Sequence, residues 1–150
     1  MERERAATVR RMARKADPDR AIAALFAPLT ARDDLFALFA FNGELARIAD
    51  QVSEPGLGAI RLQWWRDALA RAEAGEATGH PVADAFGSAL ARRGLSRERI
   101  AGLIDARSFD IGETIMPDTR TLDAYLFDTT GGLFALAAEI VGAEGENQGL

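Results

Sequence analysis

The apolar residues of this 150-residue chain recur at intervals of three and four nearly everywhere, which is the spacing of one face of an α-helix. No segment shows the strict alternation of apolar and polar residues that a half-buried strand requires. The pattern therefore predicts an all-α protein. The expected helices cover residues 6–15, 18–27, 31–54, 58–75, 81–93, 97–116 and 122–142.

Several helix boundaries are marked by residues that cap helices. Asp17 precedes Pro18, Ser96 follows Gly94, and Thr30 and Thr121 precede apolar stretches, which are positions where such side chains accept hydrogen bonds from the first turn. The only histidine, His80, stands before Pro81 and is expected to cap a helix rather than act as a base.

Length, composition and net charge limit the class of protein to which this chain can belong. With 150 residues, 48% of them apolar and 27% charged, residues 1–150 are expected to form one globular domain. The net charge of -5 argues against a nucleic-acid partner, because phosphate backbones are bound by basic surfaces. The absence of cysteine excludes disulfides and fits a reducing, cytoplasmic location.

No targeting or membrane-spanning segment is predicted. The first 20 residues are rich in arginine, but acidic residues are interspersed and an apolar signal core is lacking. The longest unbroken apolar run, 35–41, is far shorter than the roughly 20 residues that a membrane helix needs.

Two carboxylates near the end of the expected helix 31–54 are candidate metal ligands. Asp50 and Glu54 are four residues apart, so on one helix they would share a face and could hold Mg²⁺ with substrate phosphates completing its shell. The alternative is a solvated ion pair, because Arg47 lies one turn before Asp50.

Two arginines are candidate anion ligands. Arg61 shares a helical face with Trp65 and could hold a phosphate or carboxylate, although this helix also carries a core stripe that includes both Trp65 and Leu62. Arg107 falls on an apolar face, where an unpaired charge is costly. Its partner is either Asp110, one turn away, or an anionic ligand in a polar cavity.

A pair of glycines interrupts the expected last helix. Gly131 and Gly132 lie in its middle, where each costs roughly 1 kcal/mol relative to alanine. Either a neighbouring helix packs closely on them, which we favour, or a local kink lines a ligand cavity.

Several blocks resemble the squalene/phytoene synthase family, in the same order and from Asp19 to about Gly142. They read FNGELARIADQVSE, IRLQWW, HPVADAF, LIDARSFD and LDAYLFDTTGG. The resemblance implies an isoprenoid-synthase-like helical bundle, of which residues 1–150 would be the N-terminal half. It also implies that Arg32, Tyr125 and Gly131 bind a prenyl diphosphate substrate, and that Asp50 survives from a pair of aspartates that hold magnesium.

The chain departs from that family at several positions. Gly43 and Ala46 stand where synthases have an arginine and the first aspartate, and no second aspartate-rich helix precedes Leu150. The resemblance is greatest to the diverged branch that includes the mitochondrial assembly factor of respiratory complex I. The closing EGENQGL suggests an incomplete gene product.

Two functions follow from the resemblance. The chain is either a magnesium-dependent transferase that joins two prenyl diphosphates, now catalytically degenerate, or a non-catalytic module for complex I assembly or lipid binding. Half of a bundle would leave an apolar face uncovered. We therefore expect self-association or a protein partner, and peripheral contact with the inner membrane.

Overall fold

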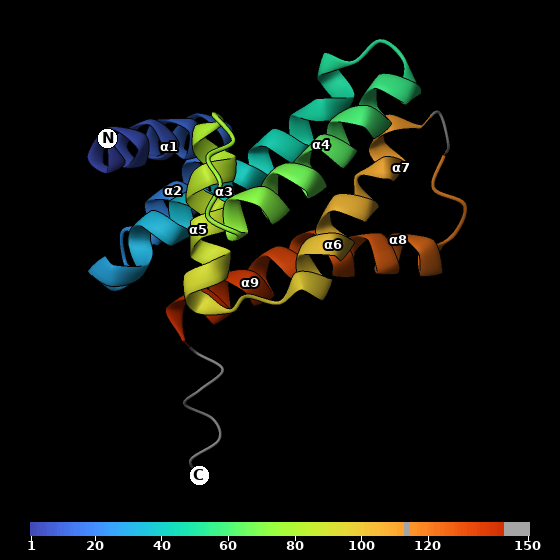
Figure 1. Ribbon diagram of the computed structural model, residues 1–150. Coiled ribbons are helices and arrows are strands. Elements are labelled where there is room, and N and C mark those ends of the chain that lie inside the picture. The colour runs from blue at the N-terminus through green and yellow to red at the C-terminus, as the bar shows by residue number, and fades with distance from the viewer. Residues whose placement is uncertain (113–114, 143–150) are drawn as a thin grey trace.

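The computed structural model describes residues 1–112 and 115–142, and these ranges contain helices and no strands (Figure 1). The all-α prediction is therefore confirmed. The elements are α1 (Glu2–Ala16), α2 (Pro18–Ala24), α3 (Leu29–Gln51), α4 (Pro55–Glu73), α5 (Pro81–Arg93), α6 (Arg97–Ala106), α7 (Ser108–Ile111), α8 (Thr119–Leu126), the π-helical turn η1 (Phe127–Gly131) and α9 (Gly132–Val141).

The long helix α3 is the centre of the core. Every residue from 34 to 41 of this helix is buried, because α1, α2, α4, α5 and α9 all pack against it (Figure 1). Phe41 stacks on Phe86 of α5 with ring centroids 4.8 Å apart, and it meets Trp65 of α4 edge-on at 5.4 Å. That residues 1–150 are half of a larger domain stays a prediction.

Three predicted helix caps are confirmed. The Asp17 side chain accepts from the Arg20 amide at 3.2 Å, Nδ1 of His80 accepts from the Val82 amide at 3.2 Å, and the Ser96 hydroxyl accepts from the Arg99 amide at 3.3 Å. Each contact satisfies a backbone donor that has no partner within its helix.

Two predicted caps are wrong. Helix α3 begins at Leu29, directly after Pro28, and no side chain caps it; Thr30 already lies inside the first turn. Helix α8 is capped by Asp118, which accepts from the Thr121 amide at 2.7 Å. Thr121 is therefore the third helical residue rather than the cap.

The helix predicted over 31–54 ends at Gln51, and this separates the two candidate metal ligands. Val52 and Glu54 both have extended backbone conformations. The cause is Pro55, the first residue of α4, because the residue before a proline is disfavoured in the helical region. Asp50 therefore belongs to α3 and Glu54 precedes α4, so the helical face predicted for them is not formed.

The helix predicted over 97–116 breaks at Arg107. Helix α6 ends at Ala106 and the single turn α7 starts at Ser108; residues 113–114 of the predicted helix lie outside the described ranges. Ile100 and Ile104 of α6 are buried. The break directs Arg107 toward α3 and α8, where its hydrogen-bond partners lie.

Close packing on glycine occurs, but not at the predicted pair. A Cβ atom at Gly87 would lie 2.3 Å from Cβ of Ala72, so α4 and α5 approach closely there. At Gly131 and Gly132 the nearest atoms would be 3.7 and 3.8 Å away, which is ordinary contact. Gly132 is nonetheless buried, with the Arg99 backbone oxygen of α6 as the nearest atom, and the π-helical turn η1 directly precedes it, so helix packing at these glycines stays a prediction.

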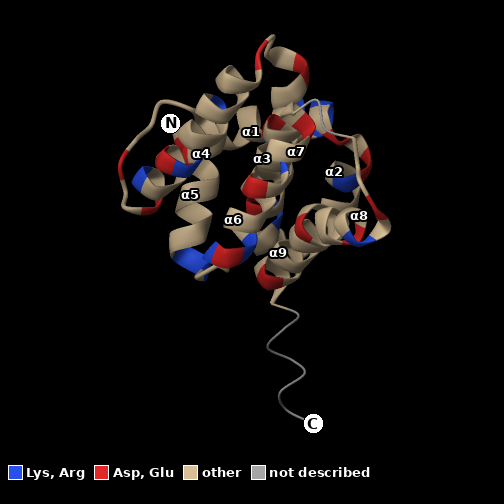
Figure 2. Cartoon of the chain, turned by 90° about the vertical axis from the view of Figure 1, so that its right-hand side faces the viewer, with Lys and Arg blue, Asp and Glu red and all other residues tan. Residues whose placement is uncertain are grey.

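Helix α9 is fastened to the α5–α6 corner by polar contacts. Arg93 of α5 donates to the backbone oxygen of Ile140 at 2.6 Å, and Glu139 accepts from the Ser96 amide at 2.9 Å and pairs with Arg99. Basic and acidic residues accordingly lie next to each other at this end of the molecule (Figure 2).

One continuous helical stretch meets a simple criterion for a membrane span. Thr119–Val141 is 23 residues long, the mean hydropathy of its most apolar 18-residue window is 1.2, and 28% of that window is buried. No such segment was expected from the sequence, because the longest unbroken apolar run is 35–41 and Asp123 and Asp128 interrupt the apolar residues of this stretch. Only the length and composition of this stretch support a membrane span, and the buried core helices of other proteins meet the same criterion.

Candidate functional site

A small polar cavity lies where α2, α3, the α6–α7 junction and α8–η1–α9 meet. Its volume is about 200 Å³. Two predicted substrate-binding residues, Arg107 and Tyr125, come together in its wall. The other lining residues are Arg20, Asn42, Leu126, Thr129, Thr130 and Leu133.

Arg107 is held by three side chains. Its guanidinium donates to Oδ2 of Asp110 at 3.0 Å, to the phenol oxygen of Tyr125 at 3.4 Å and to Oδ1 of Asn42 at 3.4 Å. The side chain is only 15% exposed. The two alternatives left open for Arg107 are thus combined, because the arginine is paired with Asp110 and also faces a cavity.

Two buried donors at this cavity remain without partners among the described residues. They are the Nε atoms of Arg107 and Arg20. Arg20 also pairs with Asp17 and stacks over the Phe134 ring, 5.4 Å from its centroid. A buried N–H without a partner is costly, so a water molecule or a ligand acceptor would be favoured at this place.

Tyr125 is kept protonated. Burial raises the pKa of its phenol, and the hydrogen bond to Asp110 raises it further, while Arg107 acts in the opposite direction. The phenol donates to Oδ1 of Asp110 at 2.7 Å. Tyr125 is therefore suited to donate a hydrogen bond to its neighbours and unsuited to act as a base near neutral pH.

The π-helical turn η1 shapes this side of the cavity. Thr129, which is buried, donates from its hydroxyl to the backbone oxygen of Tyr125 at 2.7 Å. Single π-helical turns inside α-helices frequently mark functional sites. The sequence signal was the glycine pair Gly131 and Gly132, for which a local kink was the alternative to helix packing.

Asn42 and Arg20 were missed by the sequence analysis. Asn42 directly follows the seven-residue apolar run 35–41, and this position on a core helix could have marked it as a buried polar group that needs a partner. Arg20 carried no such signal, because α2 is short and its pattern gives no clear face.

The predicted magnesium ligands do not lie on one helix. Asp50 and Glu54 are both exposed and belong to separate elements, and Arg47 pairs with Glu44 at 2.5 Å rather than with Asp50. Within residues 1–112 and 115–142, no group of three or more histidine, aspartate or glutamate side chains could hold a metal ion. The predicted pair has only two carboxylates, and magnesium binding by Asp50 and Glu54 stays a prediction.

The remaining predicted residues lie outside this cavity. Arg32 donates from Nε to the backbone oxygen of Ala27 at 2.9 Å, which holds the connection between α2 and α3. Arg61 donates to Oε1 of Gln51 at 2.8 Å and is exposed. Gly131 is exposed on η1.

Arg61 borders a second cavity of about 260 Å³, which is also lined by Trp64, Trp65 and His80. Trp65 is buried, as the core stripe predicted, whereas Trp64 is 42% exposed. The two indole rings meet edge-on at 5.0 Å.

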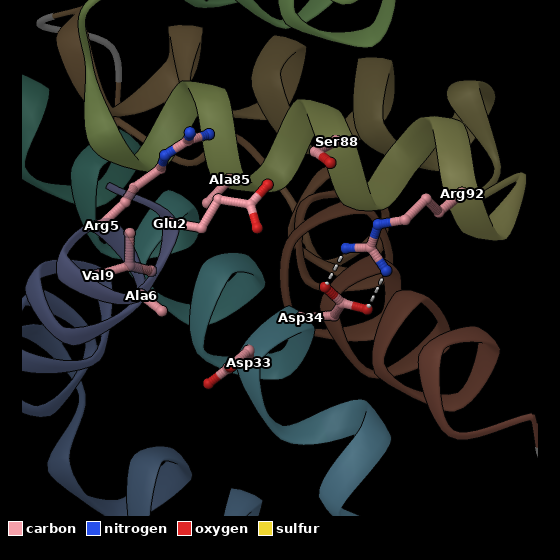
Figure 3. Close-up of a pocket in the computed structure, with 9 residues that line it drawn as sticks. All are labelled: Glu2, Arg5, Ala6, Val9, Asp33, Asp34, Ala85, Ser88 and Arg92. Atoms are coloured by element: carbon pink, nitrogen blue, oxygen red, sulfur yellow. Dashed lines mark hydrogen bonds and ion pairs between the residues drawn. The ribbon is translucent and has the colours of Figure 1, made fainter.

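A groove of about 420 Å³ between α1, α3 and α5 contains no predicted site residue (Figure 3). Asp34 lies at its base and is bound by Arg92 at 2.7 Å and by Arg93 at 2.5 Å. Burial alone would raise the pKa of Asp34, but the hydrogen bonds from both arginines outweigh burial and place the pKa below its ordinary value. This cluster joins α3 to α5 and serves the fold.

The long buried helix α3 and the tyrosine helix that borders a polar cavity define an all-helical protein of the isoprenoid-synthase type. The squalene/phytoene synthase family matches residues 13–150, and the chain belongs to this family. The family resemblance inferred from the sequence blocks is thereby confirmed.

The similar curated proteins come from the diverged branch that the sequence indicated. The chain is 30% identical over 129 residues to human NADH dehydrogenase (ubiquinone) complex I, assembly factor 6, and 32% identical over 129 residues to its bovine counterpart. Both alignments cover 86% of this chain and 39% of the relative. The chain thus spans about two fifths of the length of these relatives. No solved structure matches significantly.

Proposed function

We propose that this chain is a non-catalytic member of the squalene/phytoene synthase family that acts in the assembly of respiratory complex I. The observation that carries the proposal is the end of α3, where Ala46 replaces an aspartate and Glu54 is not on the helix that bears Asp50. The similarity to complex I assembly factors supports the same role.

The physical reason concerns the departure of pyrophosphate. Ionisation of a prenyl diphosphate requires cations that bridge the leaving group to protein carboxylates, and these ions stabilise the charge that develops. One or two exposed carboxylates on separate elements supply little of that stabilisation.

The size of the Arg107 cavity, defined by the lining residues given above, also supports a non-catalytic role. Its volume of about 200 Å³ lies below the roughly 300–1,000 Å³ of typical ligand pockets. Its polar groups are largely satisfied by one another. Such a cavity suits a water cluster or a small polar group better than two prenyl chains.

The competing proposal is a magnesium-dependent transferase that acts on prenyl diphosphates, with Asp50 and Glu54 at the metal and Arg32, Arg61, Arg107, Tyr125 and Gly131 at the substrate. The family match favours it. A lipid-binding role without turnover belongs with the non-catalytic proposal.

For the assembly role we infer a protein partner and a cytoplasmic location at the inner membrane. Leu122, Leu126 and Phe127 on α8 and η1 are exposed large apolar residues, and such a group favours a contact with another protein or self-association. A partner subunit of the complex would cover them.

The test compares a strain that lacks the gene with the parent strain. We expect the mature complex I band on native gels, stained for NADH dehydrogenase activity, to fall severalfold and to return with the full gene product. The purified full gene product should release no pyrophosphate from farnesyl or geranylgeranyl diphosphate with Mg²⁺. A normal complex I band together with pyrophosphate release would establish the transferase instead.

A further inference from the structure

The outer surface of α1 and α2 combines an apolar ridge with free basic residues, and we propose that it docks on the surface of an anionic lipid bilayer. The α2 ridge consists of Ile22, Leu25, Phe26 and Leu29, which are 60%, 43%, 86% and 78% exposed. Four large apolar side chains within eight residues form an unusually apolar exposed patch. Ile22 belongs to α2, Leu25 and Phe26 to its connection to α3, and Leu29 is the first residue of α3; this segment lies at the edge of the molecule (Figure 1).

The α2 ridge is continuous with basic residues of α1. Arg14 lines one shallow groove of about 250 Å³ together with Ile22 and Leu25. Arg3, Arg11 and Arg14 are spaced by eight and three residues, which places them on one side of α1, and all three are exposed. Lys15 is exposed beside Arg14.

Charge is segregated along the chain. Residues 1–32 contain eight arginine and lysine residues against four acidic ones, whereas the remaining 118 residues contain ten against nineteen. The N-terminal segment of this acidic protein, residues 1–32, is therefore basic. That segment would approach an anionic surface while the rest of the molecule is repelled from it.

Several of these basic side chains are not engaged in ion pairs within the described part of the chain. Arg10 is paired with Asp33 and Arg20 with Asp17. Arg3, Arg14 and Lys15 form no ion pair with any part of the chain that the structure describes. The nearby acidic residues Glu4 and Asp19 are exposed as well, and they reduce the positive charge of this surface without reversing it.

A bilayer fits this surface better than a protein pocket does. An apolar ridge flanked by arginine and lysine is the pattern of segments that lie in the membrane interface, with apolar side chains inserted by about 5–10 Å and cations at the headgroups. The ridge is exposed, and the groove that Ile22 and Leu25 border is shallow.

The first experiment measures binding of the full gene product to sedimented vesicles of phosphatidylcholine, with and without 30% phosphatidylglycerol at roughly 0.1 M salt. We expect binding that is at least tenfold stronger with the anionic lipid. The double variant Phe26→Ser/Leu29→Ser should lose about tenfold or more. Arg14→Gln/Lys15→Gln should lose about fivefold for each charge removed.

Matched controls lie elsewhere on the surface. Ile60 on α4 and Arg120 on α8 are also exposed, and Ile60→Ser and Arg120→Gln should leave vesicle binding unchanged. Because the chain contains no cysteine, a single cysteine at position 29 or 60 can carry an environment-sensitive dye. The dye at position 29 should brighten on anionic vesicles, and the dye at position 60 should not.

Two results would overturn the proposal. One is equal loss of vesicle binding in the control and test variants, or a dye response at position 60 that matches position 29. The other is absence of vesicle binding; if light scattering then shows a dimer that Phe26→Ser/Leu29→Ser abolishes, the ridge binds a second copy instead. Vesicle binding is measured without complex I, so its failure leaves the assembly role unaffected.

Discussion

The phenol of Tyr125 donates a hydrogen bond of 2.7 Å to the carboxylate of Asp110, and the guanidinium of Arg107 contacts both side chains. This relationship joins the α6–α7 junction to α8. It lies beside the π-helical turn and, through Asn42, reaches the central helix α3. The three residues thus form a structural link between the elements that enclose the cavity.

Replacement of Arg107 by methionine should destabilise the protein. The variant keeps much of the side-chain volume but removes one of the two side-chain donors to Asp110 and the arginine donor to Asn42, which should cost about 2 kcal/mol of unfolding free energy, less than for a fully buried pair. Chemical denaturation followed by tryptophan fluorescence measures the loss. The control is Arg66→Met, which breaks an exposed pair with Asp105 and should cost at most about 1 kcal/mol. Equal losses in both variants would refute this role of Arg107.

The tyrosine titration tests the same network directly, because Tyr125 is the only tyrosine. Its phenolate absorbance near 295 nm should appear with a pKa above the ordinary value of 10.0. Since the folded protein favours the protonated phenol, stability should fall as the pH rises through the ordinary tyrosine pKa, where the unfolded chain loses its proton first. Asp110→Asn should lower this pKa. A phenol that titrates at or below 10.0 in the native protein would argue against the network.

Acid should weaken the link between α3 and α5. The pKa of Asp34 is below its ordinary value of 3.8 because Arg92 and Arg93 outweigh the effect of burial, so its contribution is present above that value and is lost as the pH falls through the lower, folded pKa. Asp34→Asn should cost about 2–3 kcal/mol at neutral pH, and the difference from the native protein should vanish in acid.

The matched control for Asp34 is Asp105→Asn, at an exposed carboxylate that pairs with Arg66. It should change the unfolding free energy by no more than about 0.5–1 kcal/mol at any pH. Denaturation midpoints measured from neutral pH down to about pH 3 provide the comparison. A constant difference between Asp34→Asn and the native protein across this range would contradict the account.

Two glycine-to-alanine substitutions distinguish a glycine on which a neighbouring helix packs closely from a glycine that has room for a Cβ atom. Gly87→Ala should destabilise by about 1–3 kcal/mol, because the new Cβ would meet Cβ of Ala72 at 2.3 Å and the backbone behind it. Gly131→Ala meets nothing closer than 3.7 Å and should be neutral or stabilise by up to about 1 kcal/mol. Thermal denaturation followed by circular dichroism decides between them, and a large destabilisation at Gly131 would show that close packing was missed.

Much of the fold follows from local chemistry in the sequence. Pro81 with His80 before it and Gly94 after it set both ends of α5, where the prediction and the structure agree. The boundaries of α3 were harder, because its apolar pattern continues past Gln51 and only the proline that begins α4 stops it. The residue that caps a helix, such as Asp118 for α8, is hard to predict where several polar residues follow one another in the sequence.

The site was predictable in part. A charge on an apolar face made Arg107 conspicuous, and Asp110 was its expected partner. Asn42 and Arg20 line the same cavity although they come from distant parts of the chain. The spacing of residues around each of them in the sequence does not predict that they meet there. Tyr125 was expected from family resemblance rather than from local pattern.

The central claim is that assembly of complex I does not depend on metal-assisted chemistry at the end of α3. The most direct measurement is rescue of a gene-deletion strain by the full gene product carrying Asp50→Ala and Glu54→Ala, quantified as mature complex I on native gels at matched protein abundance. The account predicts that the double variant restores the complex to the level reached with the unaltered protein. Failure of the double variant to restore complex I, at equal abundance, would contradict it.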